Sequence, residues 1–138
     1  MKSLHTLLKV AQRKLDELGV EAARIGQDVS ELEAREASVR ARELAELANA
    51  AGNAMFASML PAYRMRVKAQ IAEIRTQAAA KEAMLEDVRR RLSDAYIEKS
   101  KFEQLIEQGR IRETSERAAI EQAQLDEVAI NRAGGQGR

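Results

Sequence analysis

The stretch LHTLLKVAQRKLDELGVEAARIGQDVSEL, residues 4–32, decides the fold of this chain. Its apolar residues recur at alternating steps of four and three: Leu4, Leu8, Ala11, Leu15, Leu18, Ala22, Ile25, Val29 and Leu32. An average step of about 3.5 residues keeps one stripe of an α-helix facing a partner helix along a left-handed supercoil. The stretch therefore predicts a long helix whose apolar seam packs against a second helix.

The seam continues beyond residue 32 with one polar interruption and one change of register. Glu36 occupies the next seam position and Val39 the one after it. Beyond Val39 the apolar stripe is expected to slip by one place, to Leu44 and Leu47. This pattern predicts a first helix over about residues 3–48.

A run of residues unfavourable to helix, NAAGNAMFASMLPAYR at positions 49–64, follows the first seam. Pro61 cannot donate a backbone hydrogen bond, and it disfavours helical backbone at Leu60. The simplest interpretation is a bend over about residues 49–61, followed by a helix with Pro61 in its first turn and Ser58 as its N-cap. Three further residues near the start of the run weaken a helix: Asn49, Gly52 and Asn53.

A second seam with the same rhythm follows the bend. It runs through Val67, Ile71, Ile74, Ala78, Lys81, Leu85, Val88, Leu92, Ala95, Lys99, Phe102 and Ile106. Beyond Ile106 the register lands on Gly109 and then on glutamates, so the seam ends there. Each stripe is too thin to sustain an isolated helix in water, so the bend should bring the two stripes together as an antiparallel pair. A parallel dimer of unbent chains is an open alternative, which would have to accommodate the helix breakers near residues 49–61.

The two predicted helices differ in length. A hairpin folded about residues 52–58 sets Leu4 opposite about residues 106–108, close to the point where the second seam ends. Residues from about 110 to 131 should then extend roughly 30 Å farther as a single helix. The segment IEQAQLDEVAIN lies on this overhang, where its apolar residues would have no intramolecular partner: Ile120, Ala123, Leu125, Val128 and Ile130. We therefore predict that the overhang is an interaction surface.

The expected fold class is all-α, a long antiparallel two-helix coiled-coil hairpin with a C-terminal helical overhang. We expect one domain over residues 1–131, with the second helix at about residues 62–131 and a flexible tail at 132–138. The composition favours long helices, because 33% of the 138 residues are charged and only 3% are aromatic. Disorder is the competing interpretation of such a composition, and the net charge of +1 and the regular apolar spacing oppose it.

Composition also limits the function classes. Balanced charge argues against a general nucleic-acid binder, and the chain has no cysteine for a disulfide or a Cys-based metal site. No apolar run approaches the roughly 20 residues that a membrane span needs. The N-terminal MKSLHTLLKVAQRK interrupts its apolar residues with Lys and Arg, so it makes a poor secretory signal. We expect a cytoplasmic protein.

No residue pattern indicates catalysis, a metal or a cofactor. His5 is the single histidine and has no ligand-type residue three or four positions away. The carboxylates should lie on solvated helix faces, and GGQGR at residues 134–138 lacks the lysine and the flanking elements of a phosphate-binding loop. The arginines of VRRRL, residues 88–92, point in different directions around a helix and should be solvated. We expect a non-enzymatic protein without a cofactor.

Methionines and aromatic residues concentrate at the bend. Two interpretations stay open: these residues cap the core of the hairpin, or they form an adaptable surface for a partner, which methionine and aromatic side chains suit. Both can hold for different residues of the set: Met55, Phe56, Met59, Leu60, Tyr63 and Met65.

Four segments of the chain have a recognisable sequence: MKSLHTLLKVAQRKLDELG at residues 1–19, FASMLPAYRMRVKAQI at 56–71, KFEQLIEQGR at 101–110 and EQAQLDEVAINR at 121–132. They resemble the flagellar export protein FliJ family and its relatives in type III secretion. In the family, a Glu-Gln pair followed by Leu-Asp-Glu and a small residue is typical near the C-terminus. Here these are Glu121, Gln122, Leu125, Asp126, Glu127 and Ala129. Pro61 departs from the family, which often runs helically through that region.

The resemblance implies an antiparallel two-helix coiled coil similar to the stalk subunit of rotary ATPases. Family members bind the hexameric flagellar export ATPase, promote its ring assembly and activity, and engage the cytoplasmic domain of the export gate. Escort of export chaperones is also attributed to the family. By this analogy the end that carries both termini enters the central channel of the ring. The chain would then be held peripherally at the cytoplasmic face of the inner membrane.

The resemblance also implies two sets of contact residues. The residues expected to contact the ATPase ring are Glu121, Gln122, Leu125, Asp126 and Val128. The residues expected to contact the export gate are Phe56, Tyr63 and Val67. Two functions of other classes stay open: a passive coiled-coil scaffold whose overhang docks an unrelated protein, and a holdase-like chaperone whose methionine-rich bend receives unfolded segments.

Overall fold

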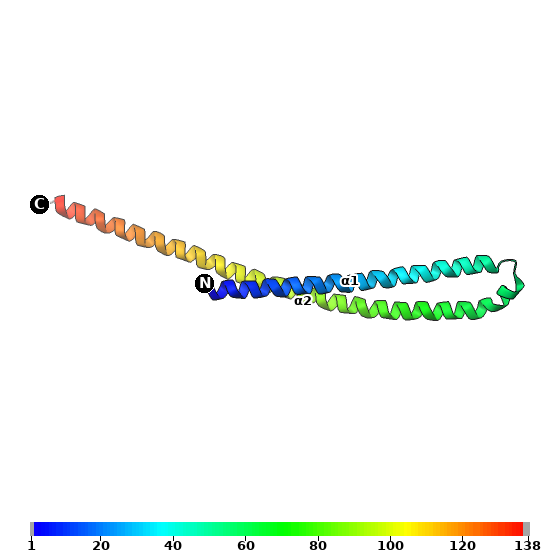
Figure 1. Cartoon of the computed structure of the whole chain (residues 1–138). Helices are drawn as coiled ribbons and strands as arrows, with labels where there is room; N and C mark the ends of the chain where they lie inside the picture. The colour runs from blue at the N-terminus through cyan, green and yellow to red at the C-terminus, as the bar shows by residue number, and fades with distance from the viewer. Residues whose placement is uncertain (1, 137–138) are drawn as a thin grey trace. The chain divides into compact units, whose positions relative to one another are not determined.

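The computed structural model describes residues 2–136, which form two α-helices and no strand. Helix α1 spans Lys2–Ala50 and helix α2 spans Ala54–Gln136. A turn at residues 51–53 joins them and lies at the right-hand end of Figure 1. The all-α helical hairpin expected from the two seams is confirmed. By its contacts the chain divides into two compact units, one of residues 15–94 and one of residues 2–14 with 95–136.

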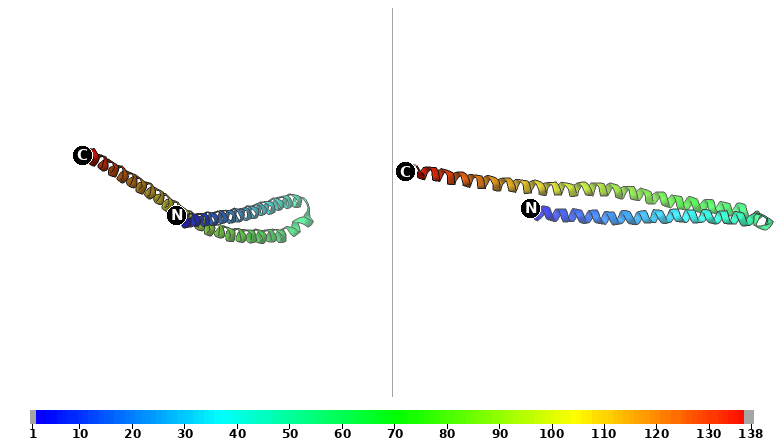
Figure 2. Two further views of the ribbon diagram at one scale, coloured as in Figure 1. Left: turned by 60° about the vertical axis from the view of Figure 1, so that its left-hand side comes forward. Right: turned by 90° about the horizontal axis from the view of Figure 1, so that it is seen from above.

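Two ion pairs fix the direction of the helices in the unit of residues 15–94. Lys81 Nζ lies 3.0 Å from Asp28 Oδ2, and Arg75 Nε lies 2.6 Å from Glu36 Oε1. The later residue on α1 pairs with the earlier residue on α2, so the two helices are antiparallel. Both views of Figure 2 show the helices running alongside each other. The core of this unit consists of Leu18, Ile25, Leu32, Ala50, Val67, Ile71, Ile74 and Val88. All except Ala50 are residues of the predicted seams.

Two polar residues that interrupt the seams, Glu36 and Lys81, each have a partner on the other helix, whereas Lys99 pairs with Glu103 on its own helix. Glu36 is half-buried in the α1 seam and accepts a hydrogen bond from Arg75, while half-buried Lys81 in the α2 seam donates one to Asp28. A charge left unpaired at such a position would lose hydration without compensation. The cross-helix pairs provide that compensation, and they also favour one register of the two seams over its neighbours.

The Glu36 pair makes the stability of the hairpin depend on pH. The hydrogen bond from Arg75, aided by the charges of Arg75 and Arg40, outweighs partial burial and holds the pKa of Glu36 below its usual value of 4.5. A depressed pKa in the folded state contributes stability above the unfolded pKa, and this is lost as pH falls through the folded pKa.

We therefore expect the native chain to have a higher unfolding temperature than Glu36→Gln at about pH 7, with the gap closing below about pH 4. Circular dichroism melts across this range measure the gap. Arg75→Gln is the matched variant, because it removes the other partner and should reproduce the same pH dependence. A gap that stays constant from neutral to acid pH would contradict the assignment.

The register change on α1 comes one step later than expected. Leu44 was predicted to lie in the seam, but 68% of it is exposed. The half-buried residues are instead Val39, Glu43 and Leu47, two successive steps of four. A step of five from Val39 would turn Leu44 about 140° away from the seam, whereas each step of four turns only about 40°. Helix α2 compensates with its own two steps of four, from Tyr63 through Val67 to Ile71.

The bend is shorter than the predicted span of 49–61. Gly52 has a positive φ of 94°, which lets the chain reverse within residues 51–53. Asn53 then caps α2: its Oδ1 accepts hydrogen bonds from the backbone N–H groups of Met55 at 3.1 Å and Phe56 at 3.4 Å. Ser58 is not the cap, because its Oγ donates to the carbonyl of Met55 inside the helix. The second helix therefore begins at Ala54 rather than near residue 62.

Pro61 lies inside α2 instead of opening it. Its missing N–H would have bonded to the carbonyl of Ala57, one turn earlier. Ala57 and Pro61 are both exposed, so water can satisfy that carbonyl. An interior proline costs about 3 kcal/mol of helix stability, which the seam packing from Val67 onward offsets.

The Asn53 cap gives a testable prediction for the bend. Asn53→Ala should lower the free energy of unfolding by about 1 kcal/mol, because two backbone donors lose their acceptor. Asn49→Ala is the matched control, since Asn49 is exposed in the last turn of α1 and alanine favours a helix there. Chemical denaturation followed by circular dichroism measures both changes. Equal stability of the Asn53→Ala variant and the native chain would count against the cap.

The second unit pairs the first turns of α1 with the later part of α2. On α1, Leu4 and Leu8 are half-buried and Ala11 is buried. On α2, Phe102 and Ile106 are half-buried as the second seam predicts. Helix α2 continues to Gln136, so residues 132–136 are helical and do not belong to the flexible tail that we expected. A helix once formed gains a hydrogen bond with each added residue, and no proline follows Pro61 to stop it. Residues 137–138 of that predicted tail lie outside the described residues.

Candidate functional site

The C-terminal part of α2 has no packing partner within the described chain. Gly109 is half-buried, and every residue from Arg110 to Gly135 is exposed. In Figure 1 this segment, drawn orange to red, runs on past the N-terminal end of α1. We call residues 110–135 the exposed helix end. The pairing therefore stops where the second seam was predicted to stop.

An ion pair within α2 marks the boundary of the exposed helix end. Arg110 donates hydrogen bonds from Nε and Nη2 to the two carboxylate oxygens of Glu107, at 3.0 and 2.7 Å. The hydrogen bonds and the charge of Arg110 lower the pKa of Glu107, and Glu107 in turn raises the pKa of Arg110. A bidentate pair three residues apart supports the helix at the point where cross-helix packing ends.

Large apolar side chains lie on the exposed helix end, with exposed fractions from 48% to 70%. Single exposed apolar residues are common on proteins, but these five lie on a helical segment in which no side chain is buried. An unpacked helix of this kind is marginal in water and gains stability from a partner that covers its apolar surface. The residues are Ile111, Ile120, Leu125, Val128 and Ile130.

These apolar residues are spread around more than half of the helix circumference. Leu125 and Val128 lie about 60° apart, because neighbouring residues are about 100° apart around the axis. Ile120 and Ile130 are each about 140° from Leu125, in opposite directions, and Ile120 lies about 80° from Val128 and about 80° from Ile130. One flat partner surface could not cover all of them. The distribution favours a partner, or a set of partners, that surrounds the helix.

The predicted ring-contact residues all lie on the exposed helix end, within slightly less than half of its circumference. All five are exposed, and Gln122 Nε2 donates a hydrogen bond to Asp126 Oδ1 at 3.1 Å. Ile120 and Ile130 were not in that set, although the sequence already showed their apolar character. They extend the apolar surface around the rest of the helix. The set was Glu121, Gln122, Leu125, Asp126 and Val128.

The predicted gate-contact residues differ in accessibility. Phe56 is exposed and Tyr63 is half-buried, and both line a shallow cavity of about 160 Å³ at the bend, together with Met59 and Leu60. Val67 is only 5% exposed and belongs to the core. The structure therefore removes Val67 from the contact set. The reason is its position in the second seam, which the α1 helix covers.

The methionine-rich bend divides between the two open interpretations. Leu60 and Tyr63 are half-buried and close the end of the core. The other members of the set are more than half exposed and are available to a partner: Met55, Phe56, Met59 and Met65. The core-capping interpretation therefore holds for Leu60 and Tyr63, and the partner surface stays a prediction for the four exposed residues.

The remaining candidate sites show only solvated side chains. His5 is exposed, and no group of three or more His, Asp or Glu side chains within residues 2–136 could hold a metal ion. Arg90 and Arg91 pair with Asp87 on their own helix, at 3.8 and 3.1 Å. Neither helix, as far as it is described, is long and apolar enough to cross a membrane.

Comparison with known proteins gives one result that spans the chain. The family model described as "Flagellar FliJ protein" matches residues 1–138. No match was found among curated proteins or among solved structures.

Proposed function

Because this chain belongs to the flagellar FliJ protein family, and so to the flagellar protein export apparatus, we propose that it acts there as a central stalk. It binds the hexameric export ATPase, promotes assembly and activity of the ring, and links the ring to the cytoplasmic domain of the export gate. It contributes no catalytic group of its own. When bound to the apparatus it lies peripherally at the cytoplasmic face of the inner membrane.

The exposed helix end is the observation that carries this proposal. A single helix is about 10–12 Å across with its side chains, so it fits a narrower channel than a pair of helices does. Its apolar residues are spread around more than half of its circumference: Leu125, Val128, Ile120 and Ile130. The channel of a ring offers contact on every side, which is what such a distribution requires.

The mechanism follows from the unequal sides of the helix. Around the channel, one ATPase subunit meets Leu125 and Val128 while another meets Ile130, about 140° from Leu125. The subunits of a working ring differ in their bound nucleotide. A ligand shifts a conformational equilibrium only when it binds the states unequally, so an asymmetric helix can favour one nucleotide state at one position of the ring. Stimulation of ATP turnover then needs no catalytic residue from the stalk.

The bend provides the second contact in this proposal. Phe56 and Tyr63 offer an aromatic surface beside a shallow cavity, and aromatic residues are enriched where proteins bind each other. Both lie at the junction of α1 and α2, whereas the exposed helix end lies at the C-terminus. The two partners would therefore bind different parts of the chain.

The direct test adds the purified chain to the purified export ATPase. ATP turnover and the fraction of ATPase found as rings in negative-stain images should both rise with the amount of chain, up to one chain per ring. A passive coiled-coil scaffold would bind without changing either quantity. Turnover and ring count that stay at their starting values at saturating chain would reject the stalk function.

A further inference from the structure

An apolar tip lies where α1 meets α2. Every residue from Ala51 to Met59 is exposed, and we call this segment the tip. It carries Met55, Phe56 and Met59, with exposed fractions of 77%, 52% and 61%. The only polar side chains in the tip are Asn53 and Ser58, and both form hydrogen bonds with nearby backbone groups. The tip therefore presents a mainly apolar surface at one end of its unit.

The sequence around the tip contains no acidic residue. No Asp or Glu occurs between Glu46 and Glu73, although the chain has 22 acidic residues. The only charged side chains in this interval are Arg64, Arg66 and Lys68, all exposed, and we call them the basic collar. Neighbouring residues differ by about 100° around a helix, so Arg64 and Lys68 lie on one side of α2, about 40° apart, and Arg66 lies on the opposite side.

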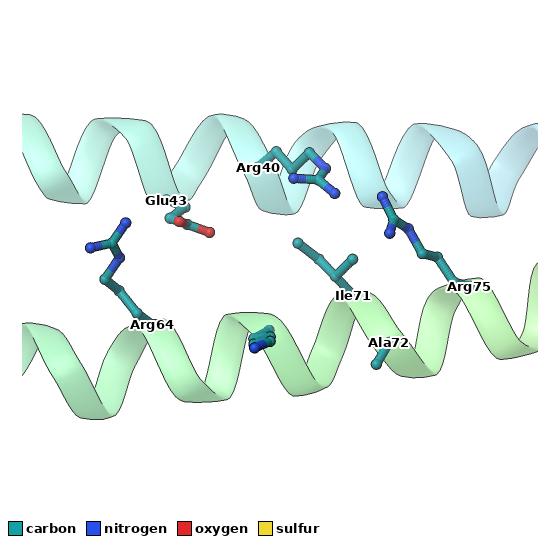
Figure 3. A pocket seen from close by; sticks show the side chains of 7 residues that line it. Arg40, Glu43, Arg64, Ile71, Ala72 and Arg75 are labelled. Carbon is teal, nitrogen blue, oxygen red and sulfur yellow. The ribbon is translucent and has the colours of Figure 1, made fainter.

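Part of the collar faces a basic groove between the helices. The groove has a volume of about 490 Å³, and four cationic side chains and one carboxylate line it. Arg40 and Glu43 come from α1, and Arg64 and Arg75 from α2, as Figure 3 shows. Arg75 and Arg40 both pair with Glu36, which leaves Arg64 and Lys68 in excess over Glu43. The region behind the tip is therefore positively charged on more than one side.

We propose that the tip inserts into the surface of an anionic phospholipid bilayer, with the basic collar bound to the lipid headgroups. Apolar residues of peripheral proteins enter a bilayer by about 5–10 Å while cations remain among the headgroups. Arg64 follows Met55 by nine residues, or about 14 Å along the helix, so an inserted tip brings the collar to the headgroup layer. A tip that enters end-on is surrounded by headgroups, and a collar with cations on two opposite sides of α2 suits that geometry.

The shape of the tip favours a bilayer over an acidic protein segment. A protein segment that docks on a surface usually finds a groove for its anchoring side chains. The cavity beside Phe56 and Tyr63 holds only about 160 Å³, and Met55 and Met59 are exposed near the start of α2, with Met59 at the edge of that cavity. Flexible methionines that are exposed near the start of a helix are suited to a fluid, apolar environment. This function goes beyond the link between the ATPase and the gate, and it needs neither partner.

The experiment is sedimentation of the full chain with lipid vesicles. Vesicles of phosphatidylcholine mixed with phosphatidylglycerol should bind the chain, and vesicles of phosphatidylcholine alone should bind it weakly. Each cation near an anionic surface strengthens binding about fivefold, so Arg64→Gln, Arg66→Gln and Lys68→Gln together should weaken it about 100-fold. Met55→Ser with Met59→Ser should weaken it about tenfold. Circular dichroism should show unchanged helicity for both variants, because all five residues are exposed.

The matched control removes three exposed arginines from the exposed helix end: Arg112→Gln, Arg117→Gln and Arg132→Gln. It changes the net charge equally and should retain vesicle binding. Equal losses in the two triple variants, or no binding to the anionic vesicles, would overturn the proposal. So would release of the chain by inorganic phosphate beyond that caused by chloride at equal ionic strength, which would indicate a site for small anions. Release by polyglutamate at low concentration would indicate an acidic protein target and would equally overturn it.

Discussion

Replacing Leu125 and Val128 together by aspartate should abolish stimulation of the export ATPase while leaving the helicity of the chain unchanged. Both side chains are exposed and lie on the same side of a helix that packs against nothing within the described chain. The substitutions therefore disturb no internal contact. In the complex, each carboxylate would have to be buried against a ring subunit without an opposite charge or a hydrogen-bond donor, which costs several kcal/mol per charge. ATP turnover measured against chain concentration gives the effect.

A matched variant separates this contact from a general effect of added charge. Val20→Asp with Leu44→Asp replaces the same two residue types, which are 70% and 68% exposed on α1. Its net charge equals that of the Leu125→Asp, Val128→Asp variant, and it should stimulate turnover like the native chain. If both double variants stimulate equally, the exposed helix end is not the contact with the ring.

Replacing Ile74 by alanine should lower the free energy of unfolding more than the other substitutions predicted above to affect the fold. Ile74 is 4% exposed in the α2 seam, and loss of a buried isoleucine side chain to alanine costs about 2–4 kcal/mol. Domains are stable by only about 5–15 kcal/mol, and a hairpin with a single thin seam should lie at the low end. The variant should therefore unfold at a clearly lower urea concentration, as followed by circular dichroism.

The control for this prediction is the same substitution on the exposed helix end. Ile130→Ala removes an isoleucine that is 70% exposed, so the free energy of unfolding should change by less than about 0.5 kcal/mol. Equal destabilisation by the two variants would mean that the exposed helix end is packed in solution. A negligible effect of Ile74→Ala would mean that the seam is not the core.

The seams could be predicted from the sequence because one physical requirement determines them. A helix that faces a single partner must bury residues at an average step of about 3.5, and few other structures impose that step. Every predicted seam residue from Leu4 to Val39 and from Val67 to Ile106 is buried or half-buried. The end of the pairing at Gly109 follows from the same requirement, because the seam has no apolar residues beyond Ile106.

The bend was placed wrongly because two local effects compete there. Pro61 is the strongest helix breaker in the sequence, yet Asn53 caps the helix eight residues earlier and Gly52 makes the reversal. A proline near the exposed start of a long helix is tolerated when packing farther along holds that helix. A sequence pattern gives the helix-breaking tendency of each residue separately. Where the helix begins depends instead on the sum of three free energies: the cap, the proline and the packing of the distant seam.

The candidate contact residues were predictable only in part. Exposure of Leu125 and Val128 follows from the length of the pairing, which the spacing of apolar residues already determines. The identity of a partner does not follow from exposure, and here it came from resemblance to a family. Val67 shows the limit of inference from resemblance. It was assigned as a contact by its position in the chain, although it lies in the second seam and is buried. Ile120 and Ile130 were predicted from the sequence as part of the interaction surface of the overhang but not as ring contacts, and both are exposed in the structure.

Hydrogen exchange of the exposed helix end, with and without the export ATPase, tests the central claim most directly. In the isolated chain the amides of residues 110–131 should exchange much faster than those of the seam around Ile74, because no packing opposes local opening. Addition of the ATPase should slow exchange in residues 110–131 and leave the seam unchanged. Exchange in residues 110–131 that is already as slow as in the seam, or that does not respond to the ATPase, would contradict the stalk function of this helix end.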